Sequence, residues 1–197
     1  ENEFSGSEAV ITESFAKKGA LRKVNTLLHE DLHQNIRLPW ENGESVITAL
    51  GDLAALEFFE TENNATIILE AKNHIERYLK VSAELLVLLP TIQRLLDTAP
   101  REEAREKSLK LIFESGNYEE YKNWYWWKEK RDSFETKLSH DWIYHKHYTT
   151  IVGLYEKAGG FRILLEDIKK APRETEAFQK YLDQLDQKYS APLSGAF

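Results

Sequence analysis

The sequence predicts an all-α fold. Apolar residues recur at helical spacing along almost all of the 197 residues, and no segment alternates apolar and polar residues over a convincing length. The 42% of apolar and 30% of charged residues are ordinary for a globular protein, and the chain holds no cysteine that could form a disulfide. No repeat, low-complexity tract or clear linker interrupts the pattern. We therefore expect residues 1–197 to form a single all-α domain.

A turn separates the first two helical segments. Residues 7–36 are expected to form one or two helices. Residues 37–43 contain Pro39 and an Asn-Gly pair, which are typical of turns. A second helix is expected over 44–60, where a polar Glu-Asn-Asn break follows. The apolar side of the first segment consists of Leu21, Val24, Leu27, Leu28, Leu32 and Ile36.

Prolines and glycines divide the rest of the chain, residues 63–197. A long helix over 65–89 is expected to end before Pro90, and a short helix over 91–98 to lie between Pro90 and Pro100. The remaining helices are predicted at 101–113, 118–138, 140–158, 161–170 and 175–189.

One short motif in the first segment indicates metal chemistry. The residues His29-Glu30-Asp31-Leu32-His33 have the pattern H-E-x-x-H. Residues four positions apart share one face of a helix, so both imidazoles can bind a single ion. Glu30 is placed to act on a metal-bound water instead of binding the metal. Chance alone produces this pattern in a chain of this length on the order of one time in a hundred, which leaves a surface helix as the alternative.

The motif and the helix after it resemble the zincin metallopeptidases of the gluzincin type. In that family a ligand Glu starts an apolar helix and a small residue follows two turns later, and Glu44 and Gly51 match this arrangement. The resemblance implies a Zn²⁺ ion bound by His29, His33 and Glu44, with Glu30 as general base. It makes residues 1–62 the metal-binding helices of the domain. It covers roughly thirty residues and is specific only in the H-E-x-x-H motif.

The chain departs from the gluzincin pattern at three points. Thr48 stands where the family usually places an Asp that orients a zinc-bound His. Glu44 follows His33 by eleven positions, about half of the usual spacing. Only 28 residues precede His29, and they are expected to be helical, whereas most zincins have a substrate-binding sheet there. The alternative third ligands are Glu13, Glu41, Asp52 and Glu57.

A second set of candidates lies near residue 145. In gluzincins a His or Tyr from outside the metal helix donates a hydrogen bond to the developing oxyanion. His145, with Asp141 one turn before it, is the first candidate for this role, and Tyr144 and His147 are alternates. A solvated helix rich in histidine is the competing interpretation. Residues 124–172 also resemble, more weakly, the helical tail of predicted bacterial aminopeptidases.

Aromatic residues gather before this segment. They suit either packing between helices or a wall of a substrate cleft that accepts apolar side chains. Trp126 and Trp127 are adjacent, so they cannot both face one core. The cluster consists of Tyr121, Trp124, Tyr125, Trp126, Trp127, Phe134 and Trp142.

Two functions fit these patterns. The first is zinc-dependent hydrolysis of a peptide or protein substrate by a metalloprotease, and the second is a non-catalytic helical binding or scaffold protein with a degenerate motif. The formal net charge of −7 argues against a nucleic-acid partner, and no apolar run is long enough for a transmembrane segment. The start without Met and the absence of cysteine favour the cell envelope or the exterior over the cytoplasm.

Overall fold

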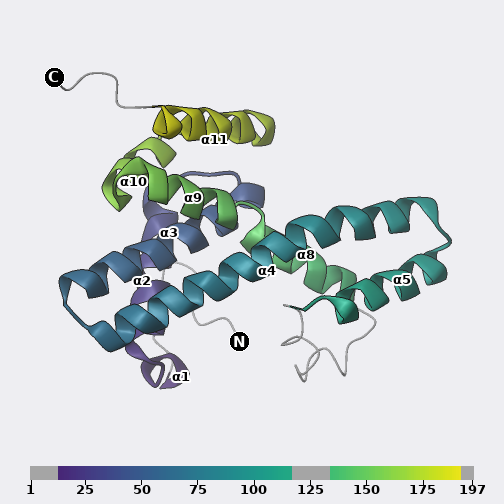
Figure 1. Ribbon diagram of the computed structural model, residues 1–197, viewed down its shortest axis with the longest axis horizontal. Helices are drawn as coiled ribbons and strands as arrows, with labels where there is room; N and C mark the ends of the chain where they lie inside the picture. The colour runs from purple at the N-terminus through teal and green to yellow at the C-terminus, as the bar shows by residue number, and fades with distance from the viewer. Residues whose placement is uncertain (1–12, 117–133, 192–197) are drawn as a thin grey trace.

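The computed structural model describes residues 13–116 and 134–191, and every regular element in these ranges is an α-helix (Figure 1). The predicted all-α class is therefore confirmed. None of the described helices combines the length and the apolar character needed to cross a membrane. The helices are α1 (Glu13–Ala16), α2 (Ala20–Asn35), α3 (Trp40–Thr61), α4 (Ala65–Thr98), α5 (Arg101–Glu114), α8 (Phe134–His145), α9 (Tyr148–Ala158), α10 (Phe161–Ile168) and α11 (Thr175–Ser190).

The apolar helix α3 is the centre of the molecule. It contacts α2, α4, α8, α9 and α10, and most of its side chains are buried. The predicted turn over 37–43 is too long, because α3 already begins at Trp40. Pro39 occupies the position before the helix with φ −56°, and its carbonyl accepts hydrogen bonds from the N–H groups of Asn42 and Gly43. The link between α2 and α3 is therefore short, and Glu44 lies in the second turn of α3.

Gly51 allows α2 and α3 to approach each other closely. A Cβ atom at this position would lie 3.5 Å from Cα of His29, which is ordinary van der Waals contact. The backbone that carries the first motif histidine thus packs directly on α3.

This contact predicts different outcomes for two substitutions of Gly51. Gly51→Ala is expected to leave stability unchanged or to raise it by up to ~1 kcal/mol, since alanine fits the space and favours the helix. Gly51→Leu is expected to cost about 1–3 kcal/mol, because a long side chain pushes α2 away from α3. Urea unfolding measures both, and a leucine variant as stable as the alanine variant would contradict the close approach.

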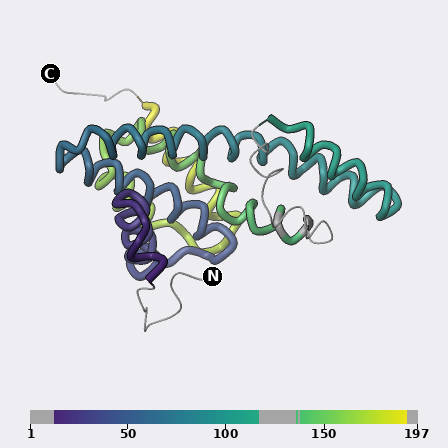
Figure 2. Tube along the Cα trace, turned by 90° about the horizontal axis from the view of Figure 1, so that it is seen from below, coloured from purple at the N-terminus to yellow at the C-terminus, as the bar shows by residue number. Residues whose placement is uncertain are grey.

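α4 is one continuous helix, so the predicted break at Pro90 is wrong. Proline removes a single backbone donor inside the helix. The buried side chains of Leu85 and Ile92, on either side of Pro90, pack with Ile112 of α5 and Leu138 of α8. This tertiary packing supports both halves of α4, which runs along the length of the molecule (Figure 2).

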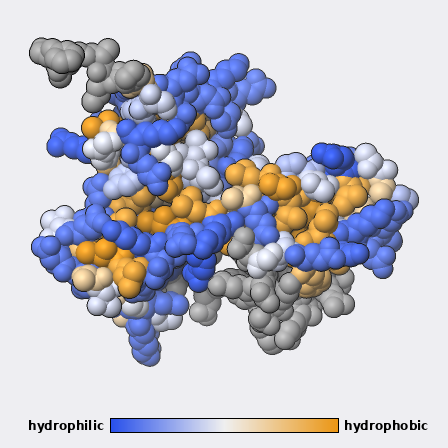
Figure 3. Space-filling model, viewed as in Figure 1, coloured by the Kyte–Doolittle hydropathy of each residue, from blue (hydrophilic) through white to orange (hydrophobic). Residues whose placement is uncertain are grey.

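The apolar interior consists of two clusters that share α4. The larger one lies around α3 and includes the first half of α4, whereas the smaller one joins the second half of α4 to α5 and α8. Apolar side chains also reach the surface on the face drawn in Figure 3. The large apolar side chains of α4 with the most exposure are Leu69, Leu86 and Val87, at 62%, 38% and 71%.

The prediction of one helix over 140–158 is also wrong, because this segment is divided between α8 and α9. The break falls at Lys146 and His147, and a fully buried side chain of α3 holds it: Oδ1 of Asn42 accepts from Nζ of Lys146 at 2.9 Å and contacts Nε2 of His147 at 3.1 Å. The predicted break after α9 is correct, because Gly159 and Gly160 have φ values of 79° and 143°.

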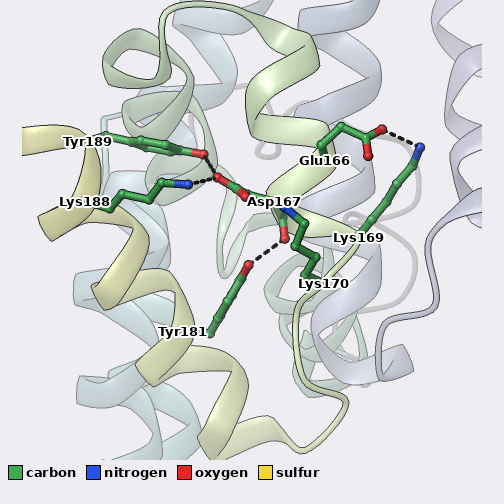
Figure 4. Close-up of polar contacts among 7 residues, drawn as sticks. All are labelled: Glu166, Asp167, Lys169, Lys170, Tyr181, Lys188 and Tyr189. Carbon is green, nitrogen blue, oxygen red and sulfur yellow. Dashed lines mark hydrogen bonds and ion pairs between the residues drawn. The ribbon is translucent and has the colours of Figure 1, made fainter.

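The last two helices are joined at the buried carboxylate of Asp167 (Figure 4). Its oxygens accept hydrogen bonds from Lys170 at 3.0 Å, Lys188 at 2.5 Å and Tyr189 at 2.7 Å. Burial opposes the charge, but these donors outweigh it and lower the pKa of Asp167 to about 2. The carboxylate is thus ionised and connects α10 to α11.

Candidate metal centre

α2 places the two motif histidines on one side of the helix. His29 and His33 are one turn apart, and their Nε2 atoms lie 3.1 Å from each other. The two side chains are 18% and 31% exposed, so the pair is half-buried and still reaches solvent. The two Nε2 atoms therefore lie close enough together to contact a single ion beside α2.

Glu44 of α3 completes a group of three. Its Oε2 lies 3.5 Å from Nε2 of His29, and its Oε1 lies 3.4 Å from Nε2 of His33. In a tetrahedral zinc site with bonds of about 2.0–2.1 Å, neighbouring ligand atoms are about 3.4 Å apart. With one ligand atom from each residue, the three atoms lie within 4.8 Å of one another, so the group could hold a metal ion. Within residues 13–116 and 134–191, this is the one group of three His, Asp or Glu residues whose ligand atoms come so close.

Electrostatic interactions within the group shift the pKa values of Glu44 and His33. Hydrogen bonds with His29 and His33 lower the pKa of Glu44 to about 2. The hydrogen bond with Glu44 raises the pKa of His33, against the effect of burial. The carboxylate is therefore ionised at neutral pH, and it favours the protonated form of His33, whose proton a cation would displace.

Glu30 lies beside the group and takes no part in it. Its side chain is half-buried on α2, and its charge contributes to the raised pKa of His33. The same charge contributes to the raised pKa of Tyr144 on α8. A carboxylate next to a metal group, but outside the ligand set, is the placement expected for a general base.

Tyr144 and His145, which are adjacent on α8, have different surroundings. Burial raises the pKa of Tyr144, and the charges of Glu44 and Glu30 raise it further. The phenol therefore stays protonated. The imidazole of His145 is 4% exposed and stacks on Tyr78 at 4.2 Å between centroids, with Nδ1 located 2.8 Å from the hydroxyl of Ser82. These contacts are with α4, so His145 is engaged away from the three residues, whereas the charges of Glu44 and Glu30 act on Tyr144.

His147, the other alternate, is also buried away from the group. It contacts Asn42 and packs edge-on against Phe178. Burial lowers its pKa to about 4, and the charge of Lys146 adds to this effect. This histidine is thus a neutral interior residue.

The rival carboxylates are engaged elsewhere. Glu13 pairs with Lys17, and Glu41 accepts from Thr175. Glu57 accepts from the hydroxyl of Tyr155 and the N–H of Phe161. Asp52 binds donors from three other helices. Glu44 is accordingly the carboxylate that meets the two histidines.

Most of the predicted aromatic cluster lies outside the described residues, including the side chain of Phe134. Trp142 lines a cavity of about 430 Å³ between α4 and α8, together with Pro90, Ile92 and Leu138. This tryptophan packs near the smaller apolar cluster and is no part of the metal group.

Sequence reasoning missed the set of polar side chains around Asp52. It treated this residue only as a rival ligand, although a charged residue inside the apolar run of α3 is itself a signal of a buried polar network. Asn25, one turn before His29, gave no signal on its own. The contacts between them depend on the pairing of α2 with α3, which sequence periodicity does not specify.

Comparison with protein families, with curated proteins and with solved structures found no match to this chain.

Proposed function

We propose that this protein is a zinc-dependent hydrolase that cleaves peptide bonds. The observation that carries the proposal is the convergence of His29, His33 and Glu44 from two helices at 3.1–3.5 Å. Two imidazoles and one carboxylate are a ligand set of catalytic zinc sites, which keep a fourth position open. The partial exposure of both histidines supports an open site.

Imidazole nitrogens and a carboxylate oxygen are suitable ligands for zinc, which would act as a Lewis acid at this site. Zn²⁺, when bound, is a Lewis acid that lowers the pKa of water toward 7 and polarises a carbonyl group. His29, His33 and Glu44 would hold the ion. Imidazole nitrogen and carboxylate oxygen also bind other divalent transition metals, so affinity must be compared among metals.

Glu30 and Tyr144 supply the proton chemistry. Glu30 accepts a proton from the attacking water and delivers it to the leaving amine, first as general base and then as general acid. Tyr144 keeps its proton because burial and two nearby carboxylates raise its pKa, so it donates a hydrogen bond to the oxygen that develops negative charge. Neither Glu30 nor Tyr144 belongs to the ligand set.

A non-catalytic binding protein is the second candidate function. The observation that favours it is the apolar cavity between α4 and α8, which lies near the exposed side chains of Leu86 and Val87. In this alternative Glu44 forms ion pairs with His29 and His33 that join α2 to α3, and the group has no catalytic role.

Metal analysis and a peptidase assay distinguish the two functions. Protein purified without added metal is expected to contain about one equivalent of zinc and to cleave a peptide library, and a chelator should abolish the cleavage reversibly. Zinc at 100 times its Kd should stabilise the protein by ≈ 2.7 kcal/mol. Absence of zinc, together with no zinc-dependent shift in melting temperature, would exclude the enzyme and leave the binding protein.

A further inference from the structure

A buried carboxylate lies on α3 about two helical turns after Glu44. Asp52 is 3% exposed and interrupts the apolar interior of α3. One of its oxygens accepts a hydrogen bond from the side-chain amide of Asn25 on α2 and lies 3.3 Å from Nε2 of His74 on α4. The other accepts from the hydroxyl of Tyr148 on α9 at 2.7 Å. One carboxylate thus joins three helices to α3.

The contacts of Asp52 reach the metal helix at the level of His29. Asn25 precedes His29 by four residues, so both side chains lie on the same face of α2. Gly51, the neighbour of Asp52, packs on the backbone of His29. The hydrogen bond between α2 and α3 is therefore separated from the first ligand by a single turn of helix.

Apolar side chains pack α2 against the core around α3, and Val24 and Leu28 take part in this packing. The large apolar side chains that α2 buries are Leu21 and Leu32, and its N-terminus has no side-chain cap. Apolar contacts tolerate small shifts of one helix along another, whereas a hydrogen bond between fixed groups does not. A metal site tolerates deviations of only about 0.2 Å in its ligand distances. The ligand group thus needs a directional contact between the two helices.

We propose that Asp52 is a positioning residue for the metal centre. By binding Asn25 it sets the rotation and the axial position of α2 on α3, and so the distances from His29 and His33 to Glu44. Tyr148 and His74 satisfy the other lone pairs of the carboxylate and anchor it to α9 and α4. The inference rests on the proposed metal site, but it assigns a role to residues that bind neither metal nor substrate.

Burial keeps Tyr148 in the state that this role requires. Tyr148 is fully buried, with an exposed fraction of 0%. Burial and the charge of Asp52 raise the pKa of its hydroxyl far above the ordinary value. Tyr148 is therefore a permanent donor, and the carboxylate keeps a hydrogen bond on each oxygen.

The test compares Asp52→Asn with a matched control, Asp167→Asn. Asp167 is also a buried carboxylate that accepts from a tyrosine hydroxyl, but it joins α10 to α11 through Lys188 and Tyr189 (Figure 4). Affinity for Zn²⁺ is measured by competition with a chelating dye, and the absorption spectrum of Co²⁺ reports the ligand geometry. Asp52→Asn is expected to weaken Zn²⁺ binding by about 10–100-fold and to change the Co²⁺ spectrum. Asp167→Asn should lower the melting temperature and leave both metal readouts within twofold.

A swapped double variant separates positioning from mere stability. Asn25→Asp combined with Asp52→Asn reverses the two partners and restores the hydrogen bond between α2 and α3, so Zn²⁺ affinity is expected to return to within about threefold of the original protein. Asn25→Ala, which leaves Asp52 with Tyr148 and His74, should weaken the metal as Asp52→Asn does, and it serves if the latter fails to fold.

Two results would overturn the inference. One is unchanged Zn²⁺ affinity in Asp52→Asn or Asn25→Ala, and the other is a folded double variant that binds metal no better than Asp52→Asn. Both differ from failure of the proposed function, in which the original protein itself binds no Zn²⁺ and the positioning role falls with it.

Discussion

Replacement of Glu30 by glutamine is expected to abolish peptide hydrolysis and to leave the zinc content at about one equivalent. Glutamine has the shape of glutamate but cannot take a proton from water. Because general-base catalysis contributes typically 10²–10⁴-fold, kcat should fall by at least about that factor while KM changes little. Steady-state kinetics with a cleaved peptide and elemental analysis of the same sample measure the two quantities.

The neighbouring carboxylate of Asp31 provides the control for this variant. It lies on the same helix and is exposed, outside the group of three ligands. Asp31→Asn should therefore keep full activity and full zinc content. Full activity of Glu30→Gln would refute the mechanism, whereas loss of zinc from that variant would make Glu30 a ligand and not the base.

The sequence predicted the class of the fold and the core of the site because both depend on local spacing. Two histidines four residues apart meet on any helix, and the apolar periodicity around them indicates that helix without further information. The break between α3 and α4 and the break at Gly159 follow equally from local signals. These features require no knowledge of how the helices pack.

Tertiary contacts decided the features that the sequence did not predict. The helix break at Lys146 depends on Asn42, which lies more than a hundred positions earlier in the chain. Pro90 stays inside α4 because apolar residues of α5 and α8 hold both sides of it. At both positions tertiary packing overrides the local helix propensity of the sequence.

The choice between Tyr144 and His145 shows the same limit at the site. Adjacent residues on a helix point about 100° apart, so Tyr144 cannot share the α4-facing position of His145. The sequence contains both residue types that can donate to an oxyanion, but not the rotation of α8 about its axis. That rotation buries His145 on Tyr78 and leaves Tyr144 in the field of Glu44 and Glu30.

Glu44 is the ligand whose assignment depends most on the structure, because the short link through Pro39 brings it to the histidines. Glu44→Gln is expected to weaken Zn²⁺ binding on the order of a hundredfold or more, since it replaces an anionic ligand by a neutral amide. Glu41→Gln, three residues earlier on the same helix and in contact with Thr175, should bind Zn²⁺ as the original protein does. Competition with a chelating dye measures both affinities, and equal affinities of the two variants would remove Glu44 from the ligand set.

The metal-free protein offers an independent measure of the same contacts through its pH dependence. The pKa of Glu44 is lowered from 4.5 to about 2, so its contribution to stability is complete above pH 4.5 and is lost as the pH falls to 2. The pKa of His33 is raised above 6.5, so its contribution is complete below pH 6.5 and is lost as the pH rises through the folded-state pKa. In the absence of metal, Glu44→Gln should therefore destabilise the protein most between pH 4.5 and 6.5 and progressively less on either side of that range. Thermal unfolding in a chelator across this range measures the difference, and a loss of stability that is the same at every pH would mean that the three side chains do not interact as ionised partners.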